Sequence, residues 1–325
     1  MRVLIVGGGA VGQVFGLHLQ NAGADLGLYE LPANAEKLKQ ALDQGGLPLY
    51  QTTFFYRRDP LVHHLKNYRV LTDIAESQSF QPDQIWFTVP SPVYYSSWFK
   101  EFLQQMPSER VVCFAPEGGR PEFFPEGAED RVIFGGTTFM AWQGGPQAGG
   151  GHPGGINFFR SPLGIPLTGK KETCRDVASL LKKAGFGVII EQPGSDMQAS
   201  VTAVMTAFVA GLELAGWSLK AFRMSPWLKL SASACREAVL SQTSHNGALQ
   251  KIILKPTVIT AAFSLTASLL PLLVPFDINQ YLGFHYRKTG KQSLILLQLF
   301  ITDGKKNDLA VANIESLLQA LQDSE

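Results

Sequence analysis

Residues 2–12 of this 325-residue chain read RVLIVGGGAVG, and this stretch decides the fold. The run 2–6 is short, apolar and rich in β-branched side chains, which predicts a buried strand. The next residues fit the pattern G-x-G-x-x-G, with glycines at 7, 9 and 12. In that pattern Gly7 makes a tight turn, Gly9 lets a pyrophosphate approach bare backbone, and Gly12 lets a helix pack closely on the strand.

The residues that follow complete a predicted dinucleotide-binding unit. An apolar stripe over 10–21 predicts a helix that opens with Ala10 and Val11, and 25–29 reads as a second strand. Glu30 ends that strand 23 residues after Gly7, close to the spacing of a carboxylate that binds an adenosine ribose. The alternative is a glycine-rich turn in some other α/β sheet, which leaves the position of Glu30 to chance.

Glu30 also bears on the choice of cofactor. A carboxylate that accepts hydrogen bonds from a ribose 2′-hydroxyl repels a 2′-phosphate, so Glu30 favours NAD over NADP. Lys37 and Lys39 lie just beyond and could serve a phosphate instead, although a solvated helix face explains them better.

The first part of the chain alternates strand and helix signals, as a parallel sheet requires. Val89, Pro90 and Ser91 follow one of these strands and should border the nicotinamide half of the cofactor, because ligands lie outside the carboxyl ends of such strands. A proline-stiffened connection is the competing interpretation. Further strands are expected at 68–71, 84–89, 110–114, 131–134, 156–159, 165–168 and 186–191, with a strand or lid at 47–58 and helices at 36–43, 93–106 and 172–184.

Beyond Gly194 strand signals nearly vanish. The remaining sequence shows helical lengths of apolar residues that are interrupted by prolines, and 309–321 is expected to form the last helix. We therefore predict a dinucleotide-binding domain over 1–194 and a helical substrate or dimerisation domain over 195–325.

Composition narrows the class of partner. The chain has 28 basic and 27 acidic side chains and no basic tract, so we expect small-molecule partners and no nucleic acid. The three cysteines are far apart, and no histidine has metal-ligand spacing, so neither a disulfide framework nor a metal site is predicted. The odd cysteine count and a strand that starts at Arg2 lead us to expect a cytoplasmic protein without a signal peptide.

Two long apolar stretches, 201–219 and 258–276, approach the length of a membrane span. The second contains hydroxyl side chains and Pro271, so we predict that it forms one or two buried helices of a soluble core. A membrane-associated protein is the rival interpretation.

The order of these features resembles the ketopantoate reductase family, whose members join a Rossmann domain to a helical domain of the 6-phosphogluconate dehydrogenase type. The similarity rests on VGGGAVGQVFGLHLQNAG at 6–23, APEGG at 115–119, GGTTFMAWQGG at 135–145 and PFDINQYLG at 275–283. It implies an α/β fold in which a doubly wound Rossmann sheet precedes an all-α domain. It also implies hydride transfer between a nicotinamide cofactor and a carbonyl substrate.

The sequence departs from this family where the chemistry occurs. Family members carry a catalytic lysine on the first helix of the second domain, and the matching position here is about Val204, with Phe208 in place of a nearby asparagine. Glu117 replaces the family's asparagine before glycine, and Asp277 replaces the glutamate of its late signature. His245 could form an acid–base pair with Asp277. Glu117, His245 and Asp277 are the catalytic candidates. Glu117 and Asp277 could equally be capping or surface residues, and a solvated loop residue explains His245 better.

We therefore predict an NAD(P)-dependent oxidoreductase that is not a standard ketopantoate reductase and that acts on a small carbonyl or alcohol between its two domains. A homodimer is left open. The competing prediction is a catalytically silent dinucleotide-binding protein, a sensor or partner that lost the lysine. The substrate and the direction of reaction do not follow from the sequence.

Overall fold

The computed structural model describes most of the chain, in two compact units. The described residues are 1–52, 59–107, 109–114, 124–128, 130–145, 151–191, 197–243, 252–274, 276–289 and 292–324. Of these described residues, those up to 191 form the first unit and those from 197 onward form the second.

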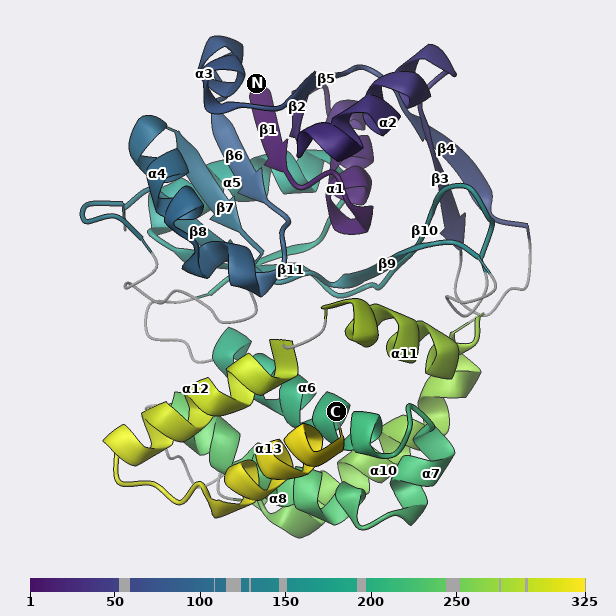
Figure 1. The fold of residues 1–325 in the computed structure, drawn as a ribbon, viewed down its shortest axis with the longest axis vertical. Helices are drawn as coiled ribbons and strands as arrows, with labels where there is room; N and C mark the ends of the chain where they lie inside the picture. The colour runs from purple at the N-terminus through teal and green to yellow at the C-terminus, as the bar shows by residue number, and fades with distance from the viewer. Residues whose placement is uncertain are drawn as a thin grey trace. The chain divides into compact units, whose positions relative to one another are not determined.

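The first unit is built on an eight-stranded sheet in the order β12-β11-β8-β7-β6-β1-β2-β5. Figure 1 labels the strands of this sheet other than β12. Six of these strands, β5-β2-β1-β6-β7-β8, run parallel in the Rossmann order, with the switch point between β1 and β6. This confirms the predicted doubly wound sheet. The strands are β1 (Arg2–Val6), β2 (Asp25–Tyr29), β5 (Tyr68–Leu71), β6 (Gln84–Phe87), β7 (Arg110–Cys113), β8 (Val132–Gly135), β11 (Ile165–Gly169) and β12 (Val188–Ile190).

The central strand β1 contributes to a core on each face of this sheet. Val3 and Ile5 pack with helices α1 (Ala10–Asn21) and α5 (Lys171–Lys183), whereas Leu4 and Val6 pack on the opposite side. That side is covered by α3 (Ile74–Phe80), the short 3₁₀ helix η1 (Ser91–Tyr95) and α4 (Ser97–Gln105). A strand buried on both faces needs an unbroken apolar run, which explains RVLIV.

A second sheet, absent from the sequence prediction, covers the outer side of α1. Its order is β4-β3-β10-β9, formed by β4 (Leu61–Leu65), β3 (Leu47–Thr52), β10 (Ile156–Arg160) and β9 (Phe139–Gln143). Strand β3 pairs in parallel with β10, more than 100 residues later in the chain. That long-range pairing leaves no local signal, so the sheet as a whole was not predicted. The strands at 61–65 and 139–143 were also missed, although each pairs with a strand nearby in sequence, β4 with β3 and β9 with β10.

Two predicted elements have different limits in the structure. The strand expected over 84–89 ends at Phe87. The helix expected over 93–106 is divided at Ser96, whose extended backbone ends η1 and whose side-chain hydroxyl accepts a 3.3 Å hydrogen bond from the N–H of Phe99. Serine competes for helical backbone groups in this way, so it begins α4 instead of continuing η1. Helix α2 (Pro32–Asp43) starts four residues before its expected position.

Every element described in the second unit is a helix, as predicted. Helix α8 (Trp227–Gln242) contacts α6, α10, α12 and α13 and forms the centre of this unit. Close packing depends on small residues, because a Cβ on Gly211 of α6 would lie 1.9 Å from the Ser231 hydroxyl of α8. The other helices are α6 (Met197–Leu214), α7 (Leu219–Met224), α10 (Pro256–Leu273), α11 (Ile278–Thr289), α12 (Gln292–Lys306) and α13 (Ala312–Ser324).

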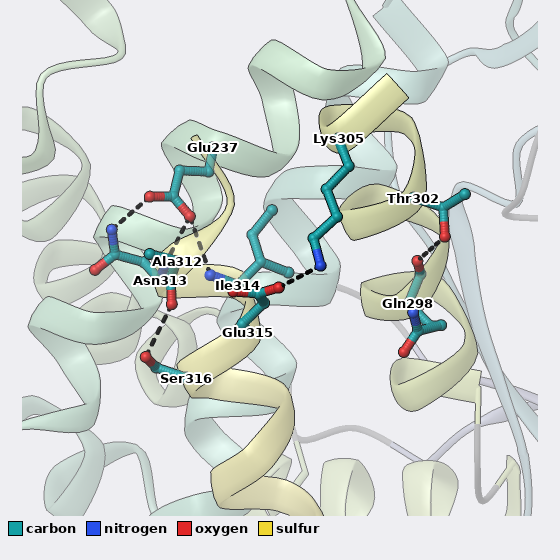
Figure 2. Close-up of polar contacts among 9 residues, drawn as sticks. All are labelled: Glu237, Gln298, Thr302, Lys305, Ala312, Asn313, Ile314, Glu315 and Ser316. Carbon is teal, nitrogen blue, oxygen red and sulfur yellow. Dashed lines mark hydrogen bonds and ion pairs between the residues drawn. The ribbon is translucent and has the colours of Figure 1, made fainter. Parts of the chain in front are cut away.

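A buried carboxylate fastens the last helix to this centre. Glu237 of α8 is 5% exposed and accepts hydrogen bonds from the backbone N–H of Asn313 at 2.8 Å and of Ile314 at 3.1 Å (Figure 2). The Asn313 amide adds a third bond at 2.5 Å. Glu237 thereby caps the first turn of α13 from a helix 76 residues earlier, where a negative charge is favoured by the helix dipole.

Within the described ranges, two helices, α6 and α10, are long and apolar enough to cross a membrane by length and composition. Their burial differs, with 44% of α6 but only 17% of α10 buried. The second apolar stretch therefore forms one helix that runs through Pro271 and buries a single stripe, Ile259, Phe263 and Ala267. Our prediction that it is a buried core helix is wrong for its remaining faces.

Candidate cofactor site

The glycine turn lies at the switch point of the large sheet. Gly7 follows β1 and Thr88 follows β6, and these two strands are neighbours in the sheet. The Thr88 hydroxyl donates a 2.8 Å hydrogen bond to the carbonyl of Gly7, and the Thr88 N–H donates to the carbonyl of Val6 at 2.9 Å. Sequence reasoning missed Thr88, although a hydroxyl residue directly after an apolar strand was a usable signal.

The three motif glycines meet different steric demands. Gly7 has a φ of +99°, and a Cβ there would lie 3.0 Å from Cγ1 of Val89, so both the conformation and the contact require glycine. A Cβ on Gly12 would lie 2.1 Å from the Gly7 carbonyl oxygen. A Cβ on Gly9 would meet no atom within 4 Å. Gly12 therefore permits close packing of helix and turn, while Gly9 leaves an open approach to the backbone.

Glu30 lies over this turn. One carboxylate oxygen accepts a 2.6 Å hydrogen bond from the N–H of Gly8, and the other accepts bonds of 3.2 Å from the N–H of Leu31 and the side-chain amide of Asn34. The carboxylate is thus held at the carboxyl end of β2 by donors from the turn and from α2. This places the predicted ribose-binding group beside the predicted pyrophosphate-binding turn.

Both backbone polar groups of Gly8 are hydrogen-bonded to side chains. Its N–H donates to Glu30, and its carbonyl accepts a 2.7 Å hydrogen bond from the side-chain amide of Gln13. Gln13 is the first residue after the glycine motif, and no feature of the motif itself identified it. Together with the bond from Thr88 to Gly7, these contacts give the turn one defined conformation.

The first turn of α1 can accept an anion. Gly9 is its N-cap, and among the described residues no side chain caps it and no acidic residue lies in its first turn. The N–H groups at the start of a helix carry a partial positive charge, so those of Ala10 and Val11 favour a phosphate.

The other predicted cofactor residues, Val89, Pro90 and Ser91, follow β6, one of the two strands at the switch point. Val89 is partly buried, packs against the core and lies against Gly7. Pro90 is exposed and caps η1, which begins with Ser91. On α2, Lys39 forms a 3.0 Å ion pair with Glu36, and Lys37 is exposed.

The structure separates the catalytic candidates. Glu117 and His245 lie outside the described residues. Asp277 is exposed, and one carboxylate oxygen accepts hydrogen bonds from the N–H groups of Asn279 at 3.0 Å and Gln280 at 3.1 Å. It therefore caps the start of α11.

The positions that correspond to the family's lysine and asparagine lie on α6. Val204 is half-buried, and Phe208 is 6% exposed, with its ring 5.2 Å from the rings of Phe222 and Phe263. Phe208 thus belongs to an apolar core.

The potential metal ligands and the thiols complete the survey of reactive side chains. In the part of the chain that the structure describes, no three His, Cys, Asp or Glu side chains come together to hold a metal ion. Cys113, Cys174 and Cys235 are buried free thiols. Burial raises the pKa of Cys235 to about 12, so it is not a thiolate at neutral pH.

Sequence comparison finds no relative: no protein-family model matches the chain, and no curated protein sequence matches it. Solved structures do match its fold. One is a 2-dehydropantoate 2-reductase from Geobacter metallireducens, with a TM-score of 0.72 and 13% identity over 100% of both chains. D-mandelate dehydrogenase, solved with NADH and anilino(oxo)acetate, matches with a TM-score of 0.68 and 16% identity over 99% of this chain and 97% of that one.

A third match is the dimeric ketopantoate reductase from Staphylococcus aureus, with a TM-score of 0.63 and 12% identity over 99% of this chain and 98% of that one. At these identities the similarity concerns the fold, and it extends over essentially the whole of each chain. The resemblance predicted from the sequence is confirmed at this level. This chain has the fold shared by the ketopantoate reductases, or 2-dehydropantoate 2-reductases, and by D-mandelate dehydrogenase.

Proposed function

We propose that this chain is an NAD(P)-dependent oxidoreductase that transfers hydride between a nicotinamide cofactor and a small carbonyl or alcohol substrate. The observation that carries the proposal is the contact of Glu30 with the Gly8 N–H at the switch point of a Rossmann sheet. This contact joins the two groups that recognise a dinucleotide. These are the carboxylate of Glu30, which accepts hydrogen bonds from the ribose, and the glycine turn, whose backbone is open to the phosphates. Two structural neighbours, both D-mandelate dehydrogenases, were solved with NADH.

Each part of the site has a role in this proposal. Glu30 accepts hydrogen bonds from the adenosine ribose, and the N–H groups of Ala10 and Val11 bind the pyrophosphate. The open backbone at Gly9 fits a phosphate, because even a Cβ there would meet no atom within 4 Å. When bound, the nicotinamide supplies or accepts the hydride.

The crevice wall completes the proposed cofactor site. Gly7 and Gly12 shape the turn, and the segment Val89, Pro90 and Ser91 borders the nicotinamide half, since it follows β6 on the other side of the switch point. We propose NAD as the preferred cofactor, because a 2′-phosphate would lie against the carboxylate of Glu30. The ion pair of Lys39 with Glu36 weakens the case for a phosphate site on α2.

The substrate in this proposal is a small molecule, and the protein is cytoplasmic and homodimeric. The neighbours support a small substrate, since one of them was solved with anilino(oxo)acetate, a 2-oxo acid derivative. Three buried free thiols suit a reducing compartment. One neighbour is described as a dimer.

A catalytically silent dinucleotide-binding protein is the second candidate. It is favoured by the described part of α6, which contains no lysine, arginine or histidine, and by Phe208, which is committed to the apolar core. Carbonyl reduction needs a proton donor for the oxygen that becomes the alcohol. Among the described residues, the catalytic candidate Asp277 caps α11, and the other two candidates, Glu117 and His245, lie outside the described residues.

Binding and turnover separate these two candidates. Purified protein is titrated with NADH and NADPH and followed by nicotinamide fluorescence, with Gly9→Val as the site variant because a Cβ at Gly9 meets no atom within 4 Å and the side chain enters the open approach. We expect saturable binding of NADH that the variant loses. No binding to the wild-type protein would overturn both candidates.

A panel of 2-oxo acids, aldehydes and alcohols is then assayed at saturating cofactor. Substrate-dependent oxidation of NADH or reduction of NAD, abolished by Gly9→Val, supports the oxidoreductase. Binding without any turnover on the panel supports the silent protein.

A further inference from the structure

Helix α10 presents an apolar face to solvent. Its buried stripe, Ile259, Phe263 and Ala267, repeats every four residues and packs the helix onto the second unit through α7 and α8. On the outer face, Leu265 is 59% exposed and Leu272 is 75% exposed, while Val258 and Leu269 are 41% and 42% exposed. Leucines that are exposed to this degree in one continuous row are uncommon on a monomer and mark a surface that binds something.

The exposed row has the spacing of a helix-pairing seam. Val258, Ala262, Leu265, Leu269 and Leu272 follow one another at intervals of four, three, four and three residues. This alternation is the heptad repeat by which one helix packs its side chains between those of another. The row occupies the face of α10 that the second unit leaves uncovered, and its spacing fits packing against a further helix.

The charge of α10 favours a second copy of the same helix over a lipid surface. None of its 18 residues is charged. Helices that lie on a membrane carry lysine or arginine on their polar face, whereas the opposite face of α10 packs against protein. Insertion across a bilayer would remove Phe263 from its contact with Phe208. An uncharged apolar seam is complementary to itself, as a twofold interface requires.

The direction of pairing follows from the ends of the helix. Lys255 caps the N-terminus of α10, where the helix dipole is already positive. Parallel pairing would bring two such ends together, whereas antiparallel pairing separates them by the length of the helix, about 27 Å. Antiparallel pairing also places the middle residue of the row, Leu265, on the twofold axis, with Val258 opposite Leu272 of the partner.

We propose that this chain forms a homodimer in which α10 pairs antiparallel with α10 of a second copy about an axis at Leu265. The inference makes the proposed homodimer specific, and its readout is molecular mass, which is independent of cofactor binding and turnover. A failure here therefore leaves the proposed redox function untouched.

The first test measures mass by sedimentation equilibrium over a range of protein concentrations. We expect the wild-type chain at twice its 35.5 kDa mass and the double variant Leu265→Asp, Leu269→Asp at 35.5 kDa. The matched control is Leu163→Asp, because Leu163 is 69% exposed and lies between β10 and β11 in the first unit. It should stay dimeric. Circular dichroism verifies that each variant is folded.

The second test reads the geometry by disulfide formation with an added oxidant. Leu265→Cys should cross-link to itself, and Val258→Cys mixed with Leu272→Cys should cross-link far better than either variant alone. The native cysteines do not interfere, because all three are buried.

The outcomes decide the proposal. A monomeric wild-type chain would overturn it, as would a dimer that both charged substitutions leave intact. If Val258→Cys cross-links to itself while the mixture of Val258→Cys and Leu272→Cys does not cross-link, the two helices pair in parallel and the proposed antiparallel arrangement is wrong. Binding of the monomer to phospholipid vesicles that the double variant abolishes would assign the face to a lipid surface instead.

Discussion

The carboxylate of Glu30 accepts a 2.6 Å hydrogen bond from the backbone N–H of Gly8, 22 residues away in sequence. This bond joins the end of β2 to the glycine turn after β1, two neighbouring parallel strands. It therefore holds the proposed ribose and phosphate sites at a fixed separation.

Glu30→Arg should change the cofactor preference. The substitution removes a charged acceptor and places a cation where a 2′-phosphate would lie, so NADH should bind at least about 10-fold more weakly while NADPH gains relative to it. Fluorescence titration with both cofactors measures the change. The control is Glu36→Arg, an equal change of charge at an exposed position of α2, which should leave the preference as it is. An unaltered preference in Glu30→Arg would remove the role given to Glu30.

Alanine at Gly12 should lower stability, whereas alanine at Gly9 should weaken cofactor binding. At Gly12 the added Cβ would lie 2.1 Å from the Gly7 carbonyl oxygen, so we expect a loss of roughly 2–4 kcal/mol in the free energy of unfolding. At Gly9 the Cβ meets nothing, so stability should hold while NADH binding weakens. Urea unfolding and cofactor titration on both variants separate the two effects. Equal stability of the two variants would contradict the packing role of Gly12.

His18 should make stability fall in mild acid. Burial, followed by repulsion from Arg160 and His63, lowers its pKa to about 4 from an ordinary value of 6.5. Because the unfolded chain then takes up the proton first, stability is complete above pH 6.5 and declines as the pH falls towards 4. The integrated loss between pH 7 and 4.5 is about 2 kcal/mol.

Unfolding free energies of the wild-type chain and His18→Leu at pH 7 and 4.5 test this effect. The decline should be smaller in the variant by about 2 kcal/mol. His64→Leu, on the exposed side of β4, is the control, and its unfolding free energy should fall as much as that of the wild type. Equal declines in all three proteins would exclude His18 as the cause.

Glu237→Gln should destabilise the helical unit. The buried carboxylate accepts three hydrogen bonds at the start of α13 (Figure 2). The side-chain amide of glutamine would point its NH₂ group at one of these three N–H donors, which should lower the free energy of unfolding by about 1–3 kcal/mol. Glu315→Gln removes only an exposed 2.8 Å ion pair with Lys305 and should cost about 0–1 kcal/mol. Urea unfolding monitored by circular dichroism compares the two. A loss at Glu315 as large as that at Glu237 would contradict the capping role.

The sequence predicted those features that depend on neighbours along the chain. The strand 2–6, the helix 10–21 and the strand 25–29 appear with their expected bounds, because apolar runs, glycine spacing and a terminal acid are local signals. The helical nature of the second unit follows in the same way from apolar stretches of helical length. Where strands pair at long range, as β3 does with β10, the sequence carried no such signal, and the four-stranded sheet was missed.

Several features depended on the tertiary structure. That Gln13 and Thr88 hold the glycine turn became visible only when the turn, α1 and the end of β6 were placed together. The same holds for α10, since its uncharged apolar sequence fits a core helix, a membrane helix or an interface equally. Which side chains of a helix are buried is decided by the elements packed against it, and for α10 these cover one stripe only. The sequence by itself determined a dinucleotide-type fold through local pattern, whereas the contacts that hold its site and the face left for a partner were decided by packing between distant segments.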